Sequence, residues 1–210
     1  MKIGRSVRRR LRRFEGPVSD LYRRQFIDLD ACARMLSGLV RARWILEVGC
    51  GDGQMASRLL ASSPGAWYTG IDVAPEVGHL FDGDRSRATF HSIDSRTYLG
   101  ETAEPFDLVV VVDVLHHVPL DARGALLDDV HELTAPRGQY VLKDWIRSGS
   151  IAHLAASSSD RLITGDHVVY FDNEELGSLV PARFPDDRLA RAVRVPPTRN
   201  NLLFVYERAP

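Results

Sequence analysis

A glycine-rich turn directly behind a short apolar run is the feature that most constrains the fold. Residues 45–54 read ILEVGCGDGQ, with Gly49, Gly51 and Gly53 at alternate positions. Such a turn between a strand and a helix exposes bare backbone, so a ligand can approach the main chain closely. The dinucleotide fingerprint G-x-G-x-x-G needs a glycine where Gln54 stands, which counts against a nicotinamide-dependent dehydrogenase.

Strand and helix patterns alternate along most of the chain. Strands are predicted at 44–48, 67–72, 88–93, 106–113, 139–144, 189–195 and 201–207. Helices are predicted at 55–61, 121–133 and 174–180. The continuous valines within 106–113 are typical of a strand buried on both faces. This alternation predicts an α/β fold with a doubly wound, mostly parallel sheet.

The N-terminal segment differs in charge from the rest of the chain. Residues 1–24 carry nine basic and two acidic residues, net +7, whereas the remainder is net −8. We interpret this segment as a basic arm that is solvated or packs on the acidic body. The alternatives are contact with nucleic acid, with an anionic membrane surface or with an acidic partner.

The chain is divided into two predicted parts. Residues 1–43 form the basic arm and a cap helix, in which Ser19 or Asp20 is expected to cap the first turn. Residues 44–210 form the core domain. Within it, 146–172 fits no strand–helix unit and is predicted to be a substrate loop, because long connections are often functional.

Composition excludes several classes of protein. No apolar run approaches the ~20 residues that span a bilayer, and the charged N-terminus is unlike a secretory signal. Two cysteines, Cys32 and Cys50, are too few for a disulfide framework and are not spaced as a metal site. We therefore expect a cytoplasmic protein.

Acidic residues follow the predicted strands that would converge on one edge of the sheet. Glu47 ends the first strand, next to the glycine turn. Asp72 ends the second and can accept both hydroxyls of a ribose, or cap a helix started by DVAPE. Asp94 follows the third and can accept from an adenine amino group, or cap a turn. Together with the glycines they predict a nucleoside-shaped crevice.

These motifs resemble those of the class I S-adenosylmethionine-dependent methyltransferases that act on small molecules. LEVGCGDG, GIDVAP, FDLVVVVDVLHHV and LTAPRGQYVLKD follow one another in the family's order and at its spacing. The resemblance implies a Rossmann-like sheet of seven strands, with an antiparallel last strand inserted beside the fifth. It also implies S-adenosyl-L-methionine as the cofactor.

The resemblance further implies which residues hold the cofactor. They are Glu47, Gly49, Cys50, Gly51, Gly53, Asp72, Val73, Ile93, Asp94, Asp113, Val114 and, from a covering helix, Tyr22. The methionine end is expected over Gly49–Gly53 and near Asp113, the ribose on Asp72, and the adenine near Ile93 and Asp94.

Two histidines after the fourth strand are the candidate catalytic residues. His116 lies in register with the general base of plant phenol methyltransferases, and His117 follows it. A base is needed only for a protonated acceptor such as a neutral hydroxyl, and a structural hydrogen bond is the alternative role. Some relatives bind magnesium through acids at Asp113 and Asp144, but Trp145 replaces their asparagine, so no metal is predicted.

The function that follows is O- or N-methylation of a small-molecule acceptor, as a tailoring step in biosynthesis. Two alternatives remain. A nucleic-acid methyltransferase would use the basic arm, although the body is acidic and no Asn-Pro-Pro-Tyr-type stretch follows the fourth strand. A protein that binds the cofactor without catalysis is the other.

Overall fold

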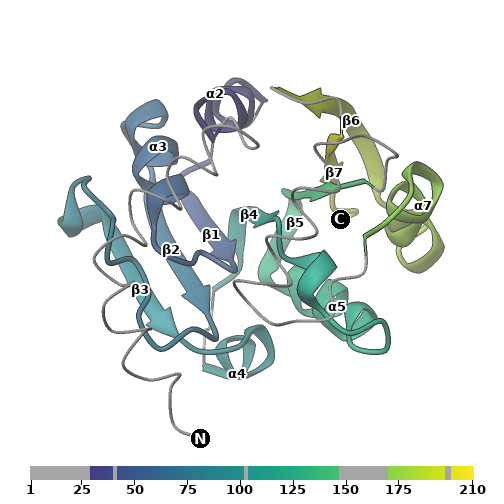
Figure 1. Cartoon of the computed structure of the whole chain (residues 1–210), viewed down its shortest axis with the longest axis horizontal. Coiled ribbons are helices and arrows are strands. Elements are labelled where there is room, and N and C mark those ends of the chain that lie inside the picture. The colour runs from purple at the N-terminus through teal and green to yellow at the C-terminus, as the bar shows by residue number, and fades with distance from the viewer. Residues whose placement is uncertain (1–28, 40–41, 102–103, 147–169, 197–199) are drawn as a thin grey trace, which may run out of the picture.

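A seven-stranded sheet with the order β3-β2-β1-β4-β5-β7-β6 forms the centre of the computed structural model (Figure 1), which describes residues 29–39, 42–101, 104–146, 170–196 and 200–210. The strands are β1 Trp44–Val48, β2 Trp67–Asp72, β3 Ala88–Ser92, β4 Phe106–Val112, β5 Thr134–Trp145, β6 Arg188–Val195 and β7 Asn201–Glu207. β7 runs antiparallel to both of its neighbours, whereas the pairs among β1 to β5 are parallel. The predicted topology is confirmed.

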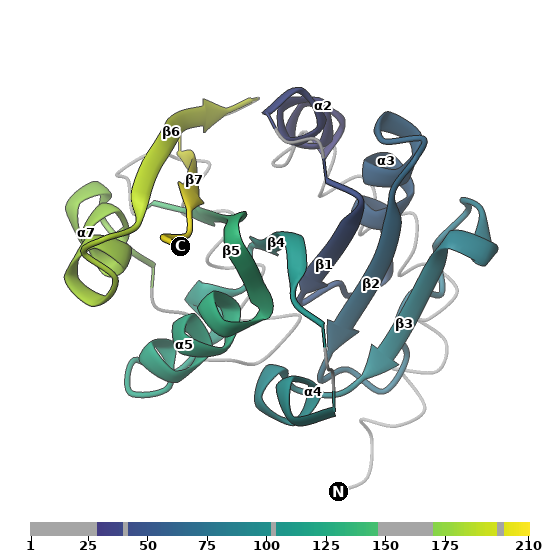
Figure 2. The same cartoon turned by 180° about the vertical axis from the view of Figure 1, so that it is seen from behind.

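Helices cover both faces of the sheet (Figures 1 and 2). They are α2 Leu29–Leu39, α3 Gln54–Ser62, α4 Ser95–Glu101, α5 Arg123–Leu133 and α7 Asn173–Arg183, with the 3-10 turns η1 Arg85–Arg87 and η2 Leu115–His117. One core joins α2 and α3 to one face, and a second joins α4, α5 and α7 to the other. The valines of β4 contribute to both cores. Val110 and Val112 belong to the core with α2 and α3, and Val109 and Val111 belong to the core with α4, α5 and α7.

The structure differs from the sequence prediction in several local features. β5 begins at Thr134, five residues before the predicted start, because Thr134 already pairs with Phe106 of β4; the irregularity in the pairing follows in the APRG segment, where Arg137 has φ 63°. α4 was not predicted, since it spans only seven residues and buries none of them. Asp72 does not cap a helix: residues 73–84 contain none, and the carboxylate instead accepts from the backbone N–H of Ala74.

Several predicted features lie outside the described residues. They include the basic arm with Tyr22 and the cap at Ser19 or Asp20, and all of the predicted substrate loop except Ile146 and 170–172. Within the described part, Cys32 and Leu36 of α2 are buried, as their spacing indicates. No helix of this part is long and apolar enough to cross a membrane.

Candidate functional site

The glycine turn lies at the carboxyl edge of the sheet, between β1 and α3. Gly49, Gly51 and Gly53 all have positive φ angles, +80°, +50° and +88°. The backbone N–H groups of Gly49 and Cys50 both donate to the carbonyl oxygen of Ile71, at 2.8 and 3.1 Å. The turn is therefore fixed to the end of β2.

Two of these glycines serve different purposes. A Cβ atom on Gly49 would lie 2.2 Å from Cγ2 of Val114, so this position must stay bare for the turn to pack on the segment after β4. A Cβ on Gly51 would meet nothing within 4 Å. Gly51 therefore borders open space, as expected of backbone that a ligand approaches.

Gly49→Ala is expected to destabilise the fold by about 2–5 kcal/mol, because it adds a left-handed backbone penalty to a steric clash. Urea unfolding gives the change in free energy. Gly100→Ala is the matched control, since its Cβ would meet nothing and Gly100 lies in α4. That control should be neutral or gain about 0.5–1 kcal/mol. Equal stability of the two variants would contradict the packing argument.

Two carboxylates flank the turn. Glu47 is 3% exposed and accepts a hydrogen bond from the Tyr68 hydroxyl at 2.5 Å. Asp72 is half-buried, and its Oδ2 accepts from the backbone N–H of Gly51 at 2.8 Å. Burial, followed by the charge of Glu47, raises the pKa of Cys50, so its thiol stays protonated.

The predicted adenine side is more exposed. Val73 is 77% exposed and Ile93 is half-buried. Asp94 precedes α4, and its oxygens accept from the backbone N–H and the hydroxyl of Thr97, at 2.9 and 2.8 Å. These bonds lower the pKa of Asp94. They also give Asp94 the geometry of a capping residue, which was the alternative to an adenine contact in the sequence analysis.

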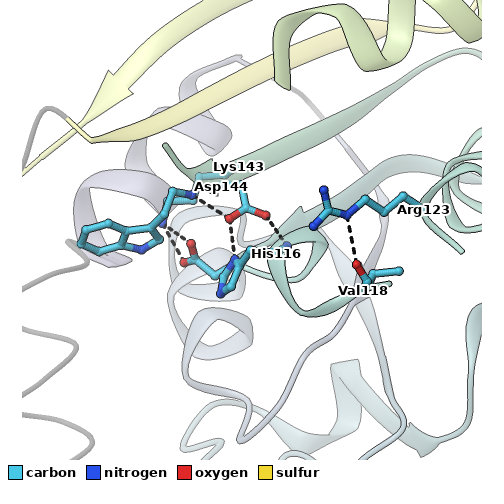
Figure 3. A network of polar contacts seen from close by, with 7 residues as sticks. His116, Val118, Arg123, Lys143 and Asp144 are labelled. Atoms are coloured by element: carbon cyan, nitrogen blue, oxygen red, sulfur yellow. Dashed lines mark hydrogen bonds and ion pairs between the residues drawn. The ribbon is translucent and has the colours of Figure 1, made fainter. Parts of the chain in front are cut away.

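A second polar cluster lies where β4 and β5 end (Figure 3). Asp113 follows β4 with φ 57°, and both of its oxygens accept from the Lys143 ammonium at 2.6 and 2.7 Å. Asp144, which is fully buried, pairs with His116: Nδ1 lies 2.5 Å from Oδ1, and the backbone N–H donates to Oδ2 at 3.1 Å.

The two candidate histidines have different surroundings. His116 is 4% exposed and its ring is nearly parallel to that of Tyr170, with centroids 5.5 Å apart. His117 is exposed, and its ring centroid lies 4.1 Å from that of His116. An ionised carboxylate can only accept, so the contact with Asp144 favours the tautomer of His116 that carries its proton on Nδ1.

A groove of about 1010 Å³ lies between α5 and α7, and Tyr170, which stacks on His116, is part of its lining. Arg123 and Phe171 also line it, with the guanidinium 4.1 Å from the centre of the phenyl ring. Nε of Arg123 donates to the carbonyl oxygen of Val118 at 3.0 Å (Figure 3). The groove therefore offers aromatic surface and a cation beside the histidine.

Sequence reasoning missed some of the residues that shape this site. They are Tyr68, Arg123 and Lys143, together with the contact of Tyr170 to His116. A lysine directly after the apolar residues of a predicted strand, in YVLKDW, is a signal that could have pointed to Lys143. The structure brings the glycine turn, Glu47 and Asp72 together, and it gathers Asp113 and His116 in the second cluster.

Comparison with known proteins identifies the fold. A family model described as a methyltransferase domain matches residues 46–140, which include the glycine turn, Asp72 and His116. These residues form a methyltransferase domain. The model stops before Lys143 and Asp144.

Curated relatives of this methyltransferase domain include small-molecule and RNA enzymes. The ubiquinone biosynthesis O-methyltransferase of Xylella fastidiosa (strain M23) is 29% identical over 152 residues, covering 70% of this chain and 59% of the relative. The tRNA N(3)-cytidine methyltransferase METTL2B of Homo sapiens is 26% identical over 179 residues, covering 78% and 47%. The chain thus spans about three fifths or less of the length of these two relatives.

Solved structures share the fold. A Burkholderia thailandensis 1,6-didemethyltoxoflavin-N1-methyltransferase with bound S-adenosylhomocysteine has a TM-score of 0.63 at 19% identity, over 87% of this chain and 79% of that one. The mitomycin 7-O-methyltransferase has a TM-score of 0.68 at 16% identity, over 95% and 60%. At these identities the likeness concerns the fold alone.

Proposed function

We propose that this methyltransferase domain transfers a methyl group from S-adenosyl-L-methionine to a small-molecule acceptor, as a tailoring step in biosynthesis. The observation that carries the proposal is the juxtaposition of an open glycine turn and the His116–Asp144 pair at one edge of the sheet, bridged by the contact between Gly49 and Val114. The acceptor atom is an oxygen or a nitrogen. Named relatives act in ubiquinone biosynthesis, which supports a biosynthetic role.

The residues present fit the cofactor. Open space above Gly51 leaves room for its methionine end, and two carboxylates, Glu47 and Asp72, lie beside that space. When bound, the cofactor supplies a methyl group that is already activated on a positively charged sulfur. Asp72 would accept from the ribose while keeping the Gly51 N–H in place. Val73, Ile93 and Asp94 would border the adenine, and Cys50, Gly53, Asp113, Val114 and Tyr22 would complete the site.

His116 is the proposed base for a hydroxyl acceptor. Oδ1 of Asp144 lies 2.5 Å from Nδ1 of His116, so the carboxylate orients the imidazole. Nε2 would then take the proton from the hydroxyl group that is methylated. The stacked ring of Tyr170 restricts rotation of the imidazole. An acceptor that is an amine or an already ionised oxygen requires no base, and the enzyme then only has to hold the acceptor atom in line with the methyl group.

The groove between α5 and α7 is the proposed place for the acceptor's body. Its lining includes Tyr170, Phe171 and Arg123, so aromatic atoms and a guanidinium border the space that the acceptor would fill. We therefore favour a small aromatic acceptor with polar substituents. The RNA-modifying relative and the net charge of +7 over residues 1–24 favour RNA as the second candidate.

Cofactor binding is tested by thermal denaturation. S-adenosylmethionine or S-adenosylhomocysteine at 100 times its dissociation constant should stabilise the fold by about 2.7 kcal/mol, which raises the melting temperature. NAD should leave it unchanged, because the fingerprint glycine is missing at Gln54. A shift with NAD and none with S-adenosylhomocysteine would refute the assignment.

The acceptor class is tested by transfer of a radiolabelled methyl group. Small phenols, aromatic amines and transfer RNA are offered in parallel to the full chain. Labelling of a small acceptor supports the proposal. Labelling of RNA alone supports the second candidate, and binding without transfer to any acceptor supports a non-catalytic role.

A further inference from the structure

Lys143 has surroundings that are unusual for a charged side chain. It is 1% exposed, although it carries an ammonium group, and a lysine is almost never buried without a partner. Its partner is Asp113, which it contacts through both carboxylate oxygens at 2.6 and 2.7 Å. The backbone N–H of Asp113 also donates to the carbonyl oxygen of Lys143 at 2.9 Å. Three bonds, two from Lys143 to Asp113 and one in the opposite direction, thus join the ends of β4 and β5.

The surrounding cluster has the composition of a metal site. Asp113, His116 and Asp144 each offer a ligand atom, and these atoms all lie within 4.8 Å of one another. Two carboxylates and an imidazole form a donor set that divalent transition metals accept. The cluster is buried on the side of His116 and Asp144.

The carboxylate oxygens of this cluster, however, already face donors. Both oxygens of Asp113 face the ammonium of Lys143. Oδ1 of Asp144 accepts from the backbone N–H of Trp145 at 2.7 Å and faces Nδ1 of His116, while Oδ2 accepts from the backbone N–H of His116. A metal ion would have to displace the ammonium, which already brings the positive charge that the acids require.

The charge balance around His116 depends on this arrangement. Asp113 and Asp144 both bring a carboxylate close to the ring. The ammonium of Lys143 neutralises the charge of Asp113. Asp144 is therefore the carboxylate that orients His116. Arg123 of α5 adds a cation that interacts with Asp144. His117 and Tyr170 also flank the ring, and both are aromatic.

We propose that the ammonium of Lys143 is the resident cation of the cluster formed by Asp113, His116 and Asp144, and that it takes the place of a divalent metal ion there. Lys143 is a positioning residue: it acts through Asp113 and does not touch the acceptor. Its effect on turnover rests on the proposed methyltransferase function, whereas its effect on metal binding rests on the geometry alone.

The first test is metal binding by the full chain, with Mn²⁺ as the probe. Wild type should not bind Mn²⁺. Lys143→Ala removes the ammonium, frees both oxygens of Asp113 and leaves a cavity beside His116 and Asp144, so Mn²⁺ at 100 times its dissociation constant should raise the melting temperature by about 5–10 °C. The double variant Lys143→Ala/Asp113→Asn is the matched control and should lose that shift. A shift of the same size in wild type, or none in a folded Lys143→Ala, would overturn the proposal.

The second test is turnover. Chelation of metals should leave wild-type turnover unchanged, and Lys143→Ala should lower it about 10–100-fold, with partial recovery when Mn²⁺ is added. Loss of wild-type turnover on chelation, restored by Mg²⁺ or Mn²⁺, would overturn the proposal, as would full turnover of Lys143→Ala.

If Lys143→Ala does not fold, the neutral pair Lys143→Met/Asp113→Asn replaces it, because removing both charges leaves none unpaired. That variant should show the same loss of turnover, and wild-type turnover in it would overturn the proposal. If wild type methylates no acceptor, the proposed function fails, and the Mn²⁺ experiment still decides the role of Lys143.

Discussion

His116→Ala should lower turnover with a hydroxyl acceptor by about 10²–10⁴-fold, the usual contribution of a positioned base. The affinity for S-adenosylhomocysteine should stay nearly the same, because the proposed cofactor contacts are the glycine turn and Asp72 and not this ring. His117→Ala should have a much smaller effect, since His117 is exposed and its neighbour has the bond to Asp144. The pair of variants therefore separates the two histidines of one 3-10 turn.

The measurement is turnover of both variants with the same phenolic acceptor between pH 6 and 9, alongside calorimetric titration of the cofactor product. The deficit of His116→Ala should narrow toward pH 9, where more of the phenol is already ionised. Full activity of His116→Ala at all of these pH values would show that the acceptor needs no base from this residue. An amine acceptor would then be favoured.

Asp72→Ala should weaken the binding of S-adenosylhomocysteine by roughly 10²–10⁴-fold. The estimate follows from two charge-assisted hydrogen bonds to the ribose, each worth about 1.5–3 kcal/mol. The variant also removes the acceptor for the Gly51 N–H, so the turn loses one of its restraints. Both effects act in the same direction.

Isothermal titration with S-adenosylhomocysteine measures this change. Asp84→Ala is the matched control, because Asp84 is an exposed aspartate that accepts from the backbone N–H of Ser86 at the start of η1. The affinity of Asp84→Ala for S-adenosylhomocysteine should equal that of wild type. Equal affinities for Asp72→Ala and Asp84→Ala would remove Asp72 from the ribose site.

The sheet was predictable because its strands are short apolar runs between turn residues. β1, β2 and β7 have the predicted bounds, and the buried valines of β4 identified a parallel sheet. The prediction failed at two segments, the start of β5 and the helix α4. APRG has the composition of a turn, yet β5 passes through it, and α4 has no apolar stripe because it buries no residue.

The site was predictable only in its first part. Gly49, Gly51, Gly53 and Asp72 lie in motifs whose spacing is visible along the chain. The pairs Lys143–Asp113 and His116–Asp144 join residues that are 30 and 28 positions apart. They depend on the register of β4 against β5, in which Val112 pairs with Lys143 after an irregularity between Phe106 and Leu108. No pattern along the chain specifies that register.

The placement of β7 between β5 and β6 determines how the edge of the sheet is held in place. β1 to β5 form a contiguous parallel block, whereas β6 is paired with β7 and with no other strand among the described residues. Displacement of β7 would therefore remove two strands from the sheet and uncover β5, which pairs with β7 from Gln139 to Trp145. That stretch contains Lys143 and Asp144, so an intact β7 is a condition for keeping the histidine cluster buried.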